Sequence, residues 1–230
     1  METPAATDAR VVTFDADQTL VDFEAARKKA LDAALAQLRR RLPAAAGLSG
    51  ADLQATRDQV ADELGPTARM EEIRRVAFRR TLEQLGAPDL ALADELTDLY
   101  LDARFRAMRL YDDVLPALAS LDAYSLGLVS NGNSYPECVG LARYFKFVFF
   151  AHDHGVRKPD RAFYEAVLAA AGCRAGELIH VGDSIENDVV AAQALGIRAV
   201  WVNRGRKRYV ASGAWAEIHS LADLPDVLAR

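Results

Sequence analysis

A chain of 230 residues, with 51% hydrophobic and 27% charged residues, is long enough for one large domain or for a domain with an insertion. Its net charge of −5 argues against nucleic acid or an anionic membrane as the main partner. No apolar stretch approaches the roughly 20 residues of a membrane span, and residues 1–10 lack an apolar signal core. Two cysteines without metal or redox spacing favour a reducing compartment, so we expect a cytoplasmic protein.

Helical spacing dominates the chain after a short apolar strand at residues 11–14. From Phe23 to Arg109, apolar residues recur three and four positions apart, as Leu31, Leu35 and Leu38 do. These segments carry many charges of both signs, which is typical of helices with solvated faces in a small bundle.

Strands and helices alternate in the second half of the chain. We expect four more strands, at 124–129, 147–150, 178–181 and 199–202. Asp112 or Asp113 can cap the helix before the first of them. The run 134–137 fits the capping box of a second helix. Gly172 closes a third helix, and a fourth ends before Gly196.

Such alternation implies right-handed crossovers and a doubly wound parallel sheet. The helical block is then an insertion after the first strand. The predicted fold is α/β: a Rossmann-like, doubly wound parallel sheet core formed by residues 1–21 and 110–230, with an inserted all-helical domain at 22–109.

Polar and charged residues follow four of the predicted strands. In a sheet of this kind, ligands bind beyond the carboxyl ends of the strands, so side chains at these positions converge on one edge. The residues are Asp15 and Asp17 after the first strand, Ser130, Asn131 and Gly132 after the second, Lys158 in the loop after the third, and Asp183 with Asp188 after the fourth.

These residue types suit phosphoryl chemistry. Asp15, Asp17 and Asp183 supply hard oxygen ligands, which favour Mg²⁺ over a softer transition metal. A hydroxyl at Ser130, nearby backbone N–H groups and the ammonium of Lys158 can cradle a phosphate. One carboxylate can attack phosphorus, and a second can protonate the leaving alcohol and later activate water.

Four motifs identify the chain by resemblance. They are FDADQTL at 14–20, VSNG at 129–132, KPD at 158–160 and GDSIEND at 182–188. In this order and context they resemble the haloacid dehalogenase-like hydrolase superfamily, over essentially the whole chain. The C1-capped phosphatases are the most similar branch, with nucleotidases and flavin mononucleotide phosphatases among them. One departure is Gln18, where many relatives have Gly.

The resemblance implies a role for each candidate residue. Asp15 would be the nucleophile, and Asp17 the general acid and base, with its backbone carbonyl on the metal. Asp183 would bind Mg²⁺ directly, and Asp188 through water or another ligand. Ser130 and Lys158 would hold the phosphoryl oxygens. Asn131 and Gly132 would complete the phosphate pocket. The helical insertion would be a C1-type cap.

The primary hypothesis is a Mg²⁺-dependent phosphoric monoester hydrolase that acts through an aspartyl-phosphate. Its substrate would be small: a nucleotide, a sugar phosphate or a flavin mononucleotide. A 2-haloacid dehalogenase is an alternative that Asp17 disfavours, because the dehalogenases lack an acid there. A phosphomutase keeps that acid and stays open. A regulatory scaffold without activity is the remaining alternative. The sequence does not reveal the oligomeric state.

Three sets of residues have both a functional and a structural interpretation. In the helical block, one or more of five arginines could contact substrate, although nearby acids favour a salt-bridged helix face. These are Arg69, Arg74, Arg75, Arg79 and Arg80. His180 lies within a predicted strand beside the site, and we expect it to be packed or to support a site residue from behind rather than to act catalytically. Arg204 belongs to a basic run that we expect in a surface loop.

Overall fold

The computed structural model describes residues 9–209 and 213–229 and divides them into two compact units. One unit consists of residues 9–21, 110–209 and 213–229, and the other is Asp22–Arg109. Residues 1–8, 210–212 and 230, which the predicted core includes, lie outside the described residues. We call the two parts the sheet unit and the helical unit.

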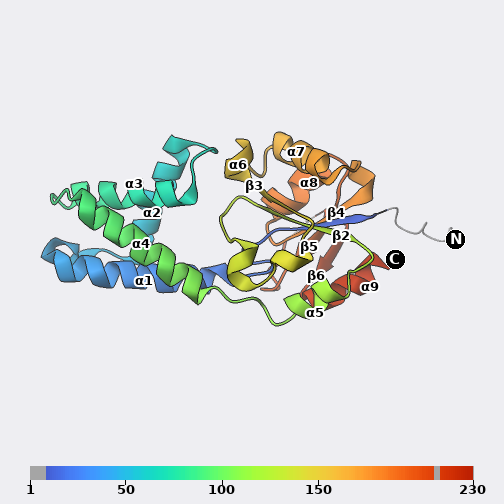
Figure 1. Ribbon diagram of the computed structural model, residues 1–230, viewed down its shortest axis with the longest axis horizontal. Coiled ribbons are helices and arrows are strands. Elements are labelled where there is room, and N and C mark those ends of the chain that lie inside the picture. Colours follow the sequence, from blue (N-terminus) through green and yellow to red (C-terminus); the bar gives the residue numbers. More distant parts are fainter. Residues whose placement is uncertain (1–8, 210–212, 230) are drawn as a thin grey trace. The chain divides into compact units, whose positions relative to one another are not determined.

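The sheet unit is built on a six-stranded, all-parallel sheet in the order β3-β2-β1-β4-β5-β6 (Figure 1). Its strands are β1 (Val11–Phe14), β2 (Ser125–Ser130), β3 (Phe147–Phe150), β4 (Leu178–Gly182), β5 (Arg198–Val202) and β6 (Ala216–Ile218). This confirms the predicted Rossmann-like fold and five of its strands. The sequence does not indicate β6, because three residues with one of them exposed give no periodic signal.

Helices cover both faces of the sheet. Figure 1 shows α7 and α8 on one face and α5 and α9 on the other. The helices of this unit are α5 (Val114–Ala119), α6 (Ala151–His154), α7 (Arg161–Ala171), α8 (Ala191–Gln193) and α9 (Leu224–Leu228). As predicted, α7 ends at a glycine: Gly172 has φ 61°, in the left-handed region that favours glycine.

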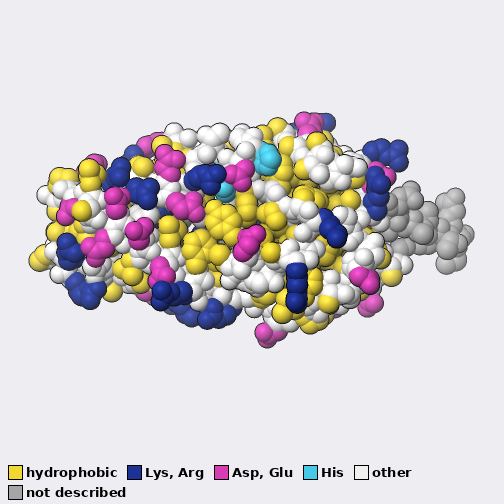
Figure 2. All heavy atoms as spheres, in the orientation of Figure 1, with side chains coloured by type: hydrophobic (Ala, Val, Ile, Leu, Met, Phe, Trp, Pro, Cys, Tyr) yellow, Lys and Arg dark blue, Asp and Glu magenta, His cyan; other side chains and the backbone are white. Residues whose placement is uncertain are grey.

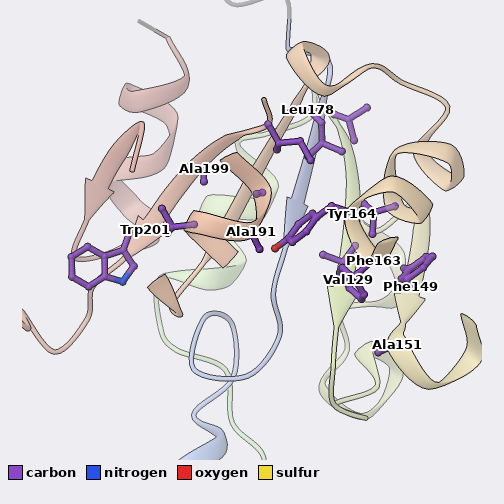
Figure 3. Packing of buried hydrophobic residues seen from close by; sticks show 14 residues of the cluster. Val129, Phe149, Ala151, Phe163, Tyr164, Leu178, Ala191, Ala199 and Trp201 are labelled. Atoms are coloured by element: carbon purple, nitrogen blue, oxygen red, sulfur yellow. The ribbon is translucent and has the colours of Figure 1, made fainter. Parts of the chain in front are cut away.

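The core of this unit lies between α7 and the sheet. Phe163 packs edge-to-face on Phe149 and on Tyr164, with ring centroids 5.2 and 5.3 Å apart. Figure 3 shows these three rings side by side, next to Val129 of β2. All four strand residues of β1 are buried, as expected for a central parallel strand with helices on both faces. The strand β1 is therefore fixed by its neighbours β2 and β4, and Asp15 follows directly at its carboxyl end.

The helical unit contains α1 (Phe23–Arg41), α2 (Gly50–Leu64), α3 (Met70–Gln84) and α4 (Leu90–Ala107). Asp22 and Asp89 cap α1 and α4 with their side chains, and Ser49 forms a capping box with Asp52 at the start of α2. Figure 2 shows basic and acidic side chains interspersed over the surface of these helices, as the sequence predicts. None of the described helices is both long and apolar enough to span a membrane.

The chain enters and leaves the helical unit through adjacent segments. Val21 and Leu110 form an antiparallel bridge. One residue further along, the backbone N–H of Asp22 donates to the carbonyl oxygen of Arg109 over 3.0 Å. The two ends of the insertion are thus hydrogen-bonded to each other.

Two predicted helix starts differ from the structure. The segment after Ser134 forms only a short 3₁₀ turn at Pro136–Val139, which ends at Gly140 with φ 73°, and it has no side-chain cap. Asp113 precedes α5 but does not cap it with its side chain. Instead, the side chains of Ser134 and Asp113 form hydrogen bonds with residues distant in sequence.

The carboxylate of Asp113 joins three segments of the sheet unit. It accepts hydrogen bonds from Arg204 over 2.8 and 2.9 Å, from Ser220 Oγ over 2.7 Å and from the N–H of Leu221 over 2.9 Å. Burial raises the pKa of Asp113, but the hydrogen bonds from Arg204 and Ser220 outweigh it and lower the pKa below its usual value. Arg204 is therefore a half-buried structural partner and not part of a solvated loop.

Replacing Asp113 with Ala should lower the free energy of unfolding by about 2–3 kcal/mol, because it removes several charge-assisted hydrogen bonds and leaves Arg204 unpaired. Urea denaturation measures this change. Asp112→Ala is the matched control at an exposed neighbouring position, with an expected change within about 0.5 kcal/mol. An equal loss in both variants would contradict the assignment.

Candidate active site

The carboxyl ends of β1, β2 and β4 bring Asp15, Ser130 and Asp183 to one edge of the sheet. Asp15 is buried, and its backbone N–H donates to the carbonyl oxygen of Val181 in β4 over 2.9 Å. Lys158 reaches the same edge from the loop that follows α6. The predicted convergence of these side chains is therefore present.

Lys158 lies at the centre of the site. Its ammonium donates to Asp15 Oδ1 over 2.5 Å, to Asp188 Oδ1 over 2.7 Å and to the carbonyl oxygen of Val129 over 3.3 Å. Only 2% of its side chain is exposed. Burial lowers the pKa of Lys158, but Asp15 and Asp188 outweigh burial and raise it above its usual value. The lysine is thus a fixed positive charge between two carboxylates.

Asn131 holds the backbone of Lys158 in place. Its Nδ2 donates to the carbonyl oxygen of Lys158 over 2.9 Å, and its Oδ1 accepts from the N–H of Lys158 over 2.8 Å. A paired contact of this kind fixes both position and orientation. The side chain of Asn131, which the resemblance assigns to the phosphate pocket, therefore acts on the lysine loop.

Asp188 has a partner for each oxygen. Besides Lys158, its Oδ1 accepts from His180 Nε2 over 3.1 Å, and its Oδ2 accepts from the N–H of Ser184 over 2.9 Å. Burial raises the pKa of Asp188, but Lys158 and then His180 outweigh it and lower the pKa below its usual value. Gly182 is needed here, because a Cβ at that position would overlap the Asp188 side chain.

His180 extends this network beneath the sheet edge. It is fully buried, and its Nδ1 lies 3.0 Å from Thr13 Oγ1. Burial lowers the pKa of His180, so the ring is neutral at pH 7. An ionised carboxylate only accepts, so Nε2 carries the proton toward Asp188, and Nδ1 accepts from Thr13. His180 is thus buried and supports a site carboxylate, one of the two uses expected for it; the sequence did not identify Asp188 as its partner.

Three carboxylates form a cluster that could hold a metal ion. One oxygen each from Asp15, Asp183 and Asp188 lies within 4.8 Å of the others. Burial and then Asp188 raise the pKa of Asp183 to about 7, and burial raises that of Asp15. Three acids with one lysine leave excess negative charge, and an all-oxygen donor set fits a hard divalent cation such as Mg²⁺.

Asp17 lies outside this cluster and has different contacts. Ser134 Oγ donates a hydrogen bond to Asp17 Oδ1. A Cβ on Gly132 would come within 2.8 Å of Asp17 Oδ2, so only glycine lets the backbone pass this close. Asp17 is half-buried, in contrast to Asp15. The local sequence pattern predicts Ser134 as a helix cap and does not indicate this contact, since nothing in that pattern distinguishes the two uses.

Ser130 and Gln18 are the remaining residues of these motifs with a notable local geometry. Ser130 Oγ accepts from the N–H of Gly132 over 3.0 Å, which leaves the hydroxyl hydrogen of Ser130 able to donate to a ligand oxygen. Gln18 has φ 62°, in the left-handed region where a glycine is the less strained choice. The departure at Gln18 therefore places a non-glycine residue in a left-handed backbone position in the turn after Asp17.

Comparisons with known proteins give a matching family and several relatives. The family described as "Hydrolase: haloacid dehalogenase-like hydrolase" matches residues 9–196. The 5-amino-6-(5-phospho-D-ribitylamino)uracil phosphatase YigB of Escherichia coli K12 is 31% identical, over 83% of this chain and 82% of that protein. A phosphoserine phosphatase of Thermus thermophilus is 35% identical, but the match spans only 56% of this chain and 53% of that protein.

A solved structure is similar over nearly the whole chain. The 2-haloacid dehalogenase from Pseudomonas syringae pv. tomato DC3000 superposes with a TM-score of 0.81 at 34% identity, over 96% of this chain and 99% of that one. Proteins named for phosphate-ester hydrolysis and for dehalogenation thus both resemble this chain.

Asp183→Asn should raise the melting temperature of the metal-free protein, because it removes a half-buried negative charge that lies near Asp188. The folded-state pKa of about 7 exceeds the usual 3.8, so the wild-type carboxyl contributes stability at low pH that is lost as pH rises toward 7. The gain in the variant should therefore grow with pH and reach a few degrees.

Thermal unfolding in EDTA, from about pH 5 to about pH 8, measures this difference. Added Mg²⁺ should stabilise the wild type and leave the variant unchanged. A variant that is less stable than the wild type at the alkaline end would contradict the electrostatic account.

Proposed function

Since this chain belongs to the haloacid dehalogenase-like hydrolases, we propose that it is a Mg²⁺-dependent phosphatase of a small phosphomonoester, acting through an aspartyl-phosphate at Asp15. The observation that carries the proposal is a pair of carboxylates in different surroundings. Asp15 is buried against Lys158, and Asp17, two residues on, is half-buried against Ser134. Different environments suit the two acids to different roles.

In the first step, a carboxylate oxygen of Asp15 attacks phosphorus and forms a new P–O bond. The bond from phosphorus to the ester oxygen breaks, and Asp17 donates a proton to that oxygen, so that a neutral alcohol leaves. In the second step, water attacks the same phosphorus, and Asp17 accepts its proton. The P–O bond to Asp15 breaks, which releases inorganic phosphate and restores both carboxyl groups.

Lys158 and Ser130 would bind the phosphoryl oxygens during both steps. The ammonium supplies fixed positive charge in a buried site, where it acts more strongly than in water. His180 and Ser184 keep Asp188 in place, and Asp188 in turn fixes Lys158. A Mg²⁺ ion held by Asp15 and Asp183, with Asp188 nearby, would neutralise phosphoryl charge and orient the group.

The relatives support a small phosphorylated metabolite as the substrate. Their names specify a phosphorylated ribitylaminouracil and phosphoserine. Nucleotides, sugar phosphates and flavin mononucleotide belong to the same size class. The helical unit would be the C1-type cap that selects among them. The sparse cysteines support a reducing compartment, the cytoplasm.

Asp15→Asn should abolish hydrolysis of p-nitrophenyl phosphate, with a loss of at least about a thousandfold in kcat, because an amide does not attack phosphorus. EDTA should remove activity reversibly, and Mg²⁺ should restore it. Phosphate release measures both effects. Asp122→Asn, which changes an exposed carboxylate of the sheet unit, is the control and should keep full activity. Robust turnover by Asp15→Asn would exclude the mechanism.

The similarity to a 2-haloacid dehalogenase favours a second candidate activity. In that reaction Asp15 would displace halide from carbon, and no acid would be needed for the leaving group. Asp17 argues against this activity. We expect no chloride release from chloroacetate or 2-chloropropionate in the presence of EDTA, measured by ion chromatography. Release under conditions where p-nitrophenyl phosphate is inert would replace the phosphatase proposal.

A further inference from the structure

Ser134 is a buried hydroxyl in the loop that follows β2, with only 2% of the residue exposed. Its Oγ donates to Asp17 Oδ1, a partner 117 positions away in the sequence. Ser120, in the same unit, is of the ordinary kind: it is exposed, and its Oγ donates to the carbonyl oxygen of Ala117 over 2.7 Å. The contact of Ser134 therefore joins the loop after β2 to the second acid that follows β1.

This loop treats the two oxygens of Asp17 differently. Oδ1 has Ser134 as a fixed donor. Oδ2 lies beside Gly132, where a Cβ would come within 2.8 Å of it. A residue without a side chain therefore borders Oδ2, and a hydroxyl binds Oδ1. The two oxygens of this carboxyl group are not equivalent.

Both segments that meet in this contact are anchored in the sheet unit. In the turn that carries the acid, the N–H groups of Leu20 and Val21 donate to the carbonyl oxygen of Ala16 over 2.9 and 3.0 Å. On the other side, the residue after the serine is Tyr135, whose ring packs edge-to-face on Phe150 of β3 with centroids 5.1 Å apart. The contact thus forms between two segments that are already held in place.

A hydroxyl that donates to Oδ1 suits both protonation states of Asp17. When the carboxyl group is ionised, Oδ1 accepts from Ser134. When a proton is bound to Oδ2, Oδ1 is the carbonyl oxygen and accepts the same hydrogen bond. The carboxyl group therefore does not have to turn between giving up a proton and taking one, and such preorganisation favours catalysis.

We propose that Ser134 is a positioning residue that makes Oδ2 the oxygen through which Asp17 transfers protons. This inference rests on the proposed function. In the first step, the proton passes from Oδ2 to the ester oxygen, while the bond from that oxygen to phosphorus breaks and the bond from Asp15 to phosphorus forms. In the second step, a proton of the attacking water passes to Oδ2, as the water oxygen bonds to phosphorus and the bond to Asp15 breaks.

Two esters of similar shape test this role. The leaving group of p-nitrophenyl phosphate is a weak base that needs little protonation, whereas that of p-nitrobenzyl phosphate is a strong base that needs a full proton. With excess enzyme and Mg²⁺, the release of each alcohol in a single turnover reports the first step alone. Ser134→Ala should slow the release of p-nitrobenzyl alcohol by at least about tenfold more than the release of p-nitrophenol.

The control is Ser120→Ala, which removes an exposed hydroxyl of the same unit and should change neither rate. A purely structural role for Ser134 predicts a different pattern. In that case Ser134→Ala would slow the release of both alcohols by the same factor, and this result would overturn the inference.

A double-mutant cycle supplies the second test. Asp17→Asn should slow the release of p-nitrobenzyl alcohol, and adding Ser134→Ala to it should slow the release less than about twofold further, because the hydroxyl acts through the carboxyl group. Losses that multiply would show that Ser134 acts independently of Asp17, against the inference.

The cycle also separates the two levels of the argument. If Asp17→Asn slows the p-nitrobenzyl ester and Ser134→Ala does not, the inference fails and the proposed function stands. If Asp17→Asn leaves that rate unchanged, or the wild type hydrolyses neither ester, the proposed function fails and the inference falls with it.

Discussion

The ammonium of Lys158, buried between Asp15 and Asp188, is the interaction on which the site depends. Without it, the carboxyl edge of the sheet would hold carboxylates that repel one another and that burial alone would protonate. With it, Asp188 is ionised and takes up two further contacts, from His180 and Ser184. The position of the lysine is itself fixed from β2, through the paired hydrogen bonds of Asn131. The site is therefore assembled by long-range contacts, although each of its residues comes from a short local motif.

Topology made much of this site predictable. Alternating strands and helices imply a parallel sheet, and in a parallel sheet every strand delivers its last residues to the same edge. For that reason Asp15, Lys158 and Asp183 could be assigned to one site from their positions after strands. The roles of Asn131 and His180 could not, because an amide or an imidazole at a given position has many possible partners.

The same limit explains the errors at helix starts. Ser134 and Asp113 stand where capping residues stand, and local pattern favours that use. Each is instead the partner of a residue distant in sequence, Asp17 in one case and Arg204 in the other. A hydrogen bond to a charged group is stronger than a neutral one, so the tertiary partner wins over the local cap. The strand β6 was missed for a different reason, because three residues are too few to show a period.

The bridge between Val21 and Leu110, with the contact between Asp22 and Arg109 beyond it, has an evolutionary consequence. An insertion whose two ends already meet can be removed, or exchanged for another of any length, without pulling β1 away from its neighbours. Exchange of the segment between these two points would therefore leave the strand order of the sheet unchanged. The sequence and length of Asp22–Arg109 can therefore change during evolution while the strands of the sheet keep their pairing.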